Sequence, residues 1–336
     1  MKGRKGSYRE EDYMYSSAKL ASMSRSLISA DTLAGLCSSG DAERMFDRLG
    51  EFGITPVRTG GKPDIESSLT GFLAGRYEEL ASFLPDAGPC RIMRSRYDCH
   101  NLKAAIKCRS LGIPADQFFI DCGSFPAEKI AKMTDGGDYS ELPAAYAGAA
   151  AEARRAADSR APARYSDALL DAACFTDMKE SADALGCVPV SDLLSLKADL
   201  TNFITTLRII RMKNEAAAEG LKADSFVPGG AVSTDVFRAA SSRGEAISAL
   251  SAVLTEDEIG RIPSDDAGIE AAGTACDRIF LWRALSLCRR RLTGIYPVID
   301  YVIRLEYEVK NLRIIYYGLE SGRDAGSIGE ELRIIV

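Results

Sequence analysis

Histidines, paired cysteines and long apolar segments are what this sequence has least of. Its 336 residues include one histidine and nine cysteines, and no CxxC pair occurs. A single imidazole excludes HExxH and other metal sites that need two histidines. An odd number of cysteines without CxxC argues against a disulfide framework and against a zinc ribbon. We therefore predict no metal site, no bound cofactor and no disulfide-stapled scaffold.

Apolar runs and an excess of basic charge are missing as well. No segment approaches the roughly 18 apolar residues of a membrane span, and Arg208 and Arg211 interrupt the best candidate. The net charge is −6, from 42 Lys+Arg against 48 Asp+Glu, which does not favour nucleic-acid binding. The basic start is not followed by the apolar stretch of a signal peptide. We expect a soluble intracellular protein with reduced thiols and no transmembrane segment of its own.

Proline is scarce, and the apolar residues follow a helical period. Only 12 prolines occur, and none lies in 190–227, 264–296 or 298–336. Apolar residues in 193–210 and 279–287 recur at spacings of three and four, which predicts amphipathic helices. The second pattern ends at Arg289–Arg291, before Gly294 and Pro297, as helices commonly do. An apolar fraction of 46% is enough for a substantial core, so we predict an all-α fold.

Other helices are expected nearer the N-terminus and in the middle of the chain. One apolar stripe covers 15–28 and another covers 42–52, with Ser38–Asp41 between them as a turn and N-cap. The Ala- and Arg-rich stretch 144–161 is typical of an exposed helix. Composition shifts near 134–138 and 256–264 suggest boundaries between structural units.

A short polar pattern occurs three times along the chain, each time inside a predicted helix. It reads acid-x-x-Asn-apolar, and its asparagines lie about one hundred residues apart. The three acid and amide pairs are Asp98 with Asn101, Asp199 with Asn202, and Glu308 with Asn311.

A second pattern follows each copy and reads Gly, small, apolar, two residues, acid. Its three glycines are Gly123, Gly230 and Gly326. A Gly-small turn before an acid favours the start of a helix. The joint recurrence in one order predicts a triplicated unit with boundaries 1–138, 139–255 and 256–336. The third unit has a truncated tail, and the units can exchange helices.

The repeated acid and amide allow two interpretations. Residues at i and i+3 share one helix face, where they can satisfy neighbouring backbone groups and maintain the packing of the unit. Alternatively, they contact a ligand or a partner. We favour the structural role, because a pair repeated in every unit is expected to serve the unit itself.

A search for catalytic groups finds no site. Residues Thr59–Lys62 resemble part of a phosphate-binding loop, but Pro63 follows Lys62 where that motif needs Ser or Thr. No GxSxG elbow occurs. His100 has no counterpart in the sister copies, which favours a surface or packing residue over a catalyst. Lysines near Cys99 and Cys108 could lower a thiol pKa, yet buried cysteine is an ordinary packing residue. We predict no catalytic, cofactor-binding or metal-binding residue.

The sequence also resembles a known family. Residues 97–107, Tyr-Asp-Cys-His-Asn-Leu-Lys-Ala-Ala-Ile-Lys, resemble the signature YDxHNLKxxxK of the C subunit of archaeal and bacterial V-type (A-type) ATPases, whose eukaryotic counterpart is the d subunit of the V-ATPase. The segments 308–315 and 328–332 resemble the end of that family, and 13–23 resembles its start, although Lys19 stands where an Arg is commoner. The resemblance covers essentially the whole chain.

This resemblance implies three similar helical units arranged about a pseudo-threefold axis as a funnel. It implies a non-catalytic rotor subunit that couples the central stalk, or axle, to the membrane ring of proteolipid subunits for ion transport and ATP synthesis. The axle subunits and the ring would be its partners, and it would lie on the cytoplasmic face of the membrane. A generic helical-repeat scaffold that binds soluble proteins is the alternative function.

Overall fold

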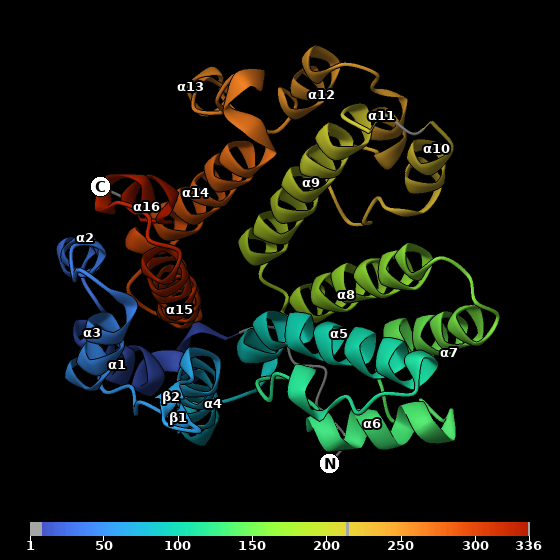
Figure 1. Cartoon of the computed structure of the whole chain (residues 1–336). Helices are drawn as coiled ribbons and strands as arrows, with labels where there is room; N and C mark the ends of the chain where they lie inside the picture. Colours follow the sequence, from blue (N-terminus) through green and yellow to red (C-terminus); the bar gives the residue numbers. More distant parts are fainter. Residues whose placement is uncertain (1–8, 213–214, 335–336) are drawn as a thin grey trace. The chain divides into compact units, whose positions relative to one another are not determined.

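The computed structural model describes residues 9–212 and 215–334, and its chain forms two compact units (Figure 1). Of the described residues, one unit contains 91–273, and the other contains 9–90 together with 274–334. Both boundaries fall inside helices, α5 (Gly88–Leu111) and α14 (Gly268–Arg289). The predicted boundaries at 138 and 255 both lie within the first of these units, so the division into three units stays a prediction about the repeat.

Helices build almost the whole of the 91–273 unit. After α5 come α6 (Ala127–Gly136), α7 (Ala144–Asp158), α8 (Ala163–Leu185), α9 (Val188–Ile210), α10 (Glu215–Asp224), α11 (Thr234–Ala239), α12 (Arg243–Leu250) and α13 (Glu256–Gly260), with 3-10 turns at Asp116–Phe118 and Asp265–Ala267. Glycines in the left-handed conformation end two of them, Gly137 after α6 and Gly186 after α8. The expected helices at 144–161 and 193–210 are therefore present as α7 and α9. The expected exposure of the first is wrong, because α7 buries Tyr146, Ala150 and Ala153 in the core.

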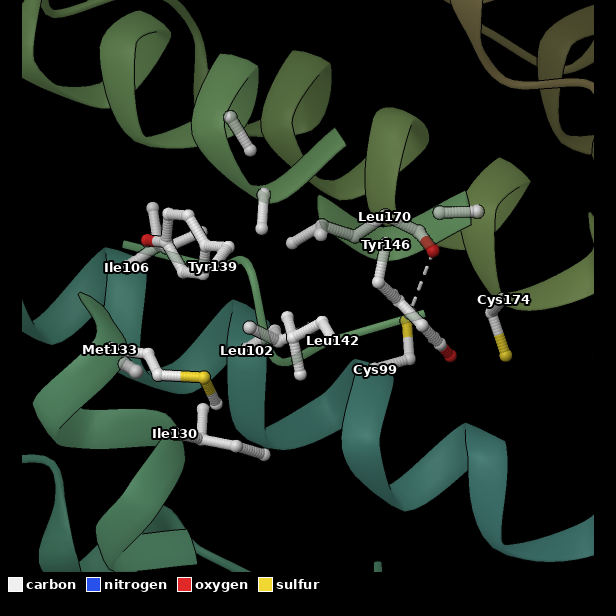
Figure 2. Close-up of a cluster of buried hydrophobic side chains, with 14 residues drawn as sticks. Cys99, Leu102, Ile106, Ile130, Met133, Tyr139, Leu142, Tyr146, Leu170 and Cys174 are labelled. Carbon is white, nitrogen blue, oxygen red and sulfur yellow. Dashed lines mark hydrogen bonds between the residues drawn. The ribbon is translucent and has the colours of Figure 1, made fainter. Parts of the chain in front are cut away.

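An apolar core holds the first four of these helices together. Helices α7 and α8 pack along each other (Figure 1). Figure 2 shows side chains of α5, α6, α7 and α8 converging on one cluster, including Leu102, Ile130, Tyr146 and Leu170, each at most 1% exposed. Alanines at 150 and 153 allow the close approach of α7. The Tyr146 hydroxyl donates to the Ser95 carbonyl at 2.8 Å, so its polar atom is satisfied inside the core.

The second unit is also helical, apart from one short hairpin. Its elements are α1 (Met14–Met23), α2 (Ala30–Cys37), α3 (Ala42–Asp47), α4 (Ile65–Phe83), the strands β1 (Arg58–Thr59) and β2 (Lys62–Pro63), most of α14, α15 (Tyr296–Glu320) and α16 (Ala325–Glu331), with 3-10 turns at Glu10–Tyr13, Ser24–Ser26 and Arg48–Phe52. The segment Thr59–Lys62, which resembles part of a phosphate-binding loop, forms the turn of the antiparallel hairpin, with positive φ at Gly60 and Gly61.

Helix α15 is the centre of this unit. It contacts α1, α2, α3, α4 and α16, and most of its residues are buried on all sides. Buried polar groups on such a helix need partners. The Tyr77 hydroxyl on α4 supplies one by donating to Glu306, which is 3% exposed.

The N-terminal stripe is the main difference from the expected helices. The helix that was expected over 15–28 ends at Met23, and a separate helix α2 follows the extended residue Leu27. The Ser29 hydroxyl starts α2 by accepting from the Thr32 N–H at 3.1 Å. The expected cap before 42–52 is present, because Asp41 accepts from the Arg44 N–H at 2.8 Å.

Candidate functional site

The three repeated asparagines make the same contact. Each side-chain amide donates to the carbonyl of one residue in an extended segment and accepts from the N–H of that residue, as a strand partner would. Asn101 binds Ile120 (2.9 and 2.9 Å), Asn202 binds Val227 (2.9 and 2.8 Å), and Asn311 binds Arg333 (3.1 and 2.7 Å). The three amides are at most 2% exposed. Because both backbone groups are held, each segment is fixed in position on its helix.

The first two acids hold the turn that follows the same segment. The Asp98 carboxylate accepts from the N–H groups of Ser124 (3.1 Å) and Phe125 (3.0 Å). The Asp199 carboxylate accepts from Ala231 (3.0 Å) and Val232 (3.1 Å). In both sites each carboxylate oxygen takes one of two consecutive N–H groups.

The glycines before these N–H groups are required by close approach. A β-carbon on Gly123 would overlap Oδ1 of Asp98, and one on Gly230 would overlap Oδ1 of Asp199. The acid and the glycine of the first two repeats are therefore in close contact, although 25 and 31 residues separate them in sequence. Burial raises the pKa of Asp98 to about 6 and also raises that of Asp199, while the backbone N–H donors oppose the shift.

The third copy keeps the helix residues and loses the glycine turn. Oε2 of Glu308 accepts from the N–H of Ile28 at 2.6 Å, and burial raises the pKa of Glu308 to about 7. Gly326 lies inside α16, which Asp324 caps through the Ser327 N–H at 3.0 Å, and it does not adjoin Glu308. The expected equivalence of Gly326 with Gly123 and Gly230 is therefore wrong. The acid of the third pattern, Glu331, is the last residue of α16, whereas Glu128 and Asp235 lie in the first turns of their helices.

One further residue of the first site was missed by the sequence reasoning. Nε of Arg94 donates to the Cys122 carbonyl at 3.0 Å, and its Nη2 donates to the Gly123 carbonyl. Arg94, Asp98 and Asn101 lie at i, i+4 and i+7, so they share one face of α5. The same spacing recurs at Arg304, Glu308 and Asn311, whereas Ser195 stands at that position in the second copy. This spacing was the available signal.

The remaining candidates have ordinary structural surroundings. His100 is exposed, and its Nε2 lies 2.9 Å from the Phe118 carbonyl oxygen. Lys103 pairs with Asp171 at 2.6 Å, and Lys107 pairs with Asp167 at 2.7 Å, so both lysines are bound to α8. All nine cysteines are free and buried.

The suggestion of an activated thiol at Cys99 is wrong. A hydrogen bond with Cys174 and burial raise the pKa of Cys99 above its ordinary value, and these effects outweigh the nearby Lys103 charge. The thiol donates to the Leu170 carbonyl at 3.3 Å (Figure 2).

Within 9–212 and 215–334, no three or more His, Cys, Asp and Glu side chains gather as metal ligands would. Among the same residues, none of the helices combines the length and the apolar character that a membrane span needs.

The class of protein follows from comparison with known families. Residues 16–331 match the model of the ATP synthase (C/AC39) subunit family. The chain belongs to this family. It is therefore a C subunit of the V/A-type ATP synthases, a non-catalytic subunit of a rotary ATP synthase.

Curated relatives align along nearly the whole chain. The C subunit of the A-type ATP synthase of Thermococcus onnurineus is 22% identical over 336 residues, which cover 95% of this chain and 89% of the relative. The C subunit of the V-type sodium ATPase of Enterococcus hirae is 22% identical over 311 residues, covering 91% and 94%. A third, the C subunit of the A-type ATP synthase of Thermococcus gammatolerans, is 23% identical over 348 residues, covering 95% and 90%.

Proposed function

We propose that this chain is the rotor subunit that couples the central stalk to the membrane ring of proteolipid subunits. Its partners would be the axle subunits on one side and the ring on the other, at the cytoplasmic face of the membrane. We further propose that the chain arose by triplication and that its three repeats form a funnel-shaped socket around the axle.

The observation that carries this proposal is a contact that recurs three times in a member of this family. We call it the asparagine joint: the side-chain amide of a repeated asparagine (Asn101, Asn202 or Asn311) bonds both the N–H and the carbonyl of one residue. Three helices each hold one backbone residue through both of its polar groups. Such contacts act on the backbone, so they stiffen the link between a long helix and the segment that crosses it. A part that transmits torque needs stiffness of this kind more than a reactive group.

These hydrogen bonds are buried, and burial makes them costly to break. Two hydrogen bonds in a site that excludes water cannot exchange with solvent partners, and leaving either backbone group unpaired costs about 1–3 kcal/mol. A load that moves the segment away from its helix must therefore break hydrogen bonds that water cannot replace.

The experiment compares a reconstituted ATPase with and without this chain. We expect the assembly that lacks it to hydrolyse ATP while ion transport is lost, and transport to return when the chain is added back. Transport that persists without the chain would refute the proposal. ATP turnover by the isolated chain would refute it as well.

A second measurement distinguishes the coupling function from the alternative, a scaffold for soluble proteins. A coupling protein should co-purify with the detergent-solubilised ring, and a generic scaffold should not. The family membership favours the first outcome.

A further inference from the structure

Three consecutive arginines form an exposed basic patch at the end of α14. Arg289 is the last residue of this helix, Arg290 and Arg291 follow it, and all three side chains are exposed. A cation in the last turn of a helix is stabilised by the helix dipole, which accounts for one of them. Two further cations beside it add repulsion between like charges, so the end of the helix does not explain the triplet.

These arginines differ from the other arginines of the surface in having no acidic partner. Among the residues that the structure describes, none of the three forms an ion pair, and Arg291 instead donates to the Tyr296 hydroxyl and lies over its ring. Other exposed arginines pair with acids of their own helix or turn, as in Arg44–Asp41, Arg48–Glu51 and Arg155–Glu152. The positive charge of the triplet is therefore available to a partner.

An apolar side chain protrudes directly beside this charge. Leu292 is 80% exposed, the highest value among the large apolar side chains of the described residues. Trp282 is 39% exposed and precedes Arg289 by seven residues, so the two share one face of α14. Arginine, leucine and tryptophan together on an exposed surface are typical of a segment that enters the interface of a lipid bilayer.

An anionic bilayer fits the patch better than a folded protein does. A protein partner would need a hollow shaped to receive the protruding Leu292, whereas fluid acyl chains close around it. The arginine guanidinium binds phosphate oxygens in pairs, and each basic residue near an anionic membrane adds about fivefold to its affinity. The net charge of −6 does not prevent this, because charges more than about 8 Å away are largely screened at physiological salt.

Acidic residues border the patch on one side. The Thr293 hydroxyl donates to Glu10, and Glu11 and Asp12 follow in the 3-10 turn Glu10–Tyr13. These exposed acids repel an anionic surface, so removal of one of them should act on lipid binding in the opposite direction to removal of an arginine.

We propose that Arg289–Leu292 and Trp282 form a docking surface for anionic phospholipid. The arginines bind the phosphates of the headgroups, Leu292 inserts between the acyl chains, and Trp282 lies at the level of the headgroups. The surface is argued from its own charges and exposure, so it goes beyond the proposed coupling function and does not depend on it.

Titration with lipid vesicles tests this surface in the full chain. The vesicles contain equal parts of phosphatidylcholine and phosphatidylglycerol, and the control vesicles contain phosphatidylcholine alone. Trp282 is the single tryptophan of the sequence, so its fluorescence reports on this face of α14. We expect saturable binding to the mixed vesicles with emission shifted to shorter wavelength, no binding to the neutral vesicles, and weaker binding as salt is raised.

Substitutions then assign the binding to the patch. Arg290→Gln should weaken it about fivefold, and replacing all three arginines by glutamine should abolish it. Arg44→Gln removes the same charge from a side chain that is 75% exposed elsewhere in the unit, so it should leave binding unchanged. Leu292→Ala should weaken binding because less apolar surface enters the bilayer, and Glu10→Gln should strengthen it.

The outcomes separate this proposal from its alternatives. No binding to the mixed vesicles, or an equal loss in Arg44→Gln and Arg290→Gln, would overturn it. Binding to a polyglutamate peptide without binding to vesicles would also overturn it and would assign the patch to an acidic protein. Since the measurement uses only the isolated chain and lipid, its failure leaves the coupling proposal standing, which the transport assay tests separately.

Discussion

Replacing Asn202 by alanine removes both bonds of one asparagine joint and creates no new charge. Asn202 is fully buried and Val227 is 3% exposed, so neither backbone group of Val227 can turn to water in the folded state. Each of the two unpaired groups costs about 1–3 kcal/mol, which gives an expected loss of about 2–6 kcal/mol in the free energy of unfolding. The loss should concentrate at the 227–232 segment, since Asp199 holds only its far end.

Denaturant unfolding followed by circular dichroism measures the total effect, and hydrogen exchange of the Val227 N–H measures the local one. A loss of about 2 kcal/mol corresponds to exchange about thirtyfold faster. Thr205→Ala is the matched control on α9, because among the described residues its hydroxyl bonds only to the Thr201 carbonyl of its own helix. If Asn202→Ala costs no more than this control, the joint does not stiffen the unit and the mechanical argument fails.

Three further predictions concern the turn, the third acid and the thiols. Gly123→Ala should destabilise the fold because its β-carbon displaces Asp98, whereas Gly148→Ala, in open space on α7, should stabilise it by up to about 1 kcal/mol, both measured as melting shifts. The raised pKa of Glu308, about 7 against 4.5, means that its stabilising contribution is complete below pH 4.5 and is lost as pH rises through 7. Glu308→Gln should remove up to about 3 kcal/mol of this pH dependence of unfolding, and equal slopes for both proteins would contradict it. The buried thiols should react with iodoacetamide only on unfolding, and prompt labelling of Cys99 in the native chain would show that its environment is misjudged.

The predictable part of the site was the part encoded within one helix. Asn101, Asn202 and Asn311 could be found because a helix fixes the spacing of its own residues. Arg94 lies one turn before Asp98 on the same face, so the same spacing indicates it. The first two glycine turns followed from a short pattern that lies next to a real helix start. The same pattern failed at Gly326, where the local cap signal of Asp324 placed the glycine inside a helix instead.

The unpredictable part was set by contacts between distant segments. Nothing near Glu308 in sequence indicates that Ile28, 280 residues away, would supply its donor. The fold class followed from periodicity and scarce proline, but the joining of 9–90 with 274–334 depends on how α15 is surrounded. The missed helix α2 is a milder case, because Ser29 and the spacing of Leu33 and Leu36 were available as signals.

The asparagine joint has an evolutionary consequence. Its amide makes its hydrogen bonds to the N–H and carbonyl of the residue it holds, so any residue except proline can make the same pair of bonds. The chain illustrates this freedom, since the three held residues are isoleucine, valine and arginine. A contact that involves only the backbone of the held residue allows that residue to change in evolution while the asparagine stays the same. We expect the sequences of the held segments to be less constrained than the three asparagines that hold them.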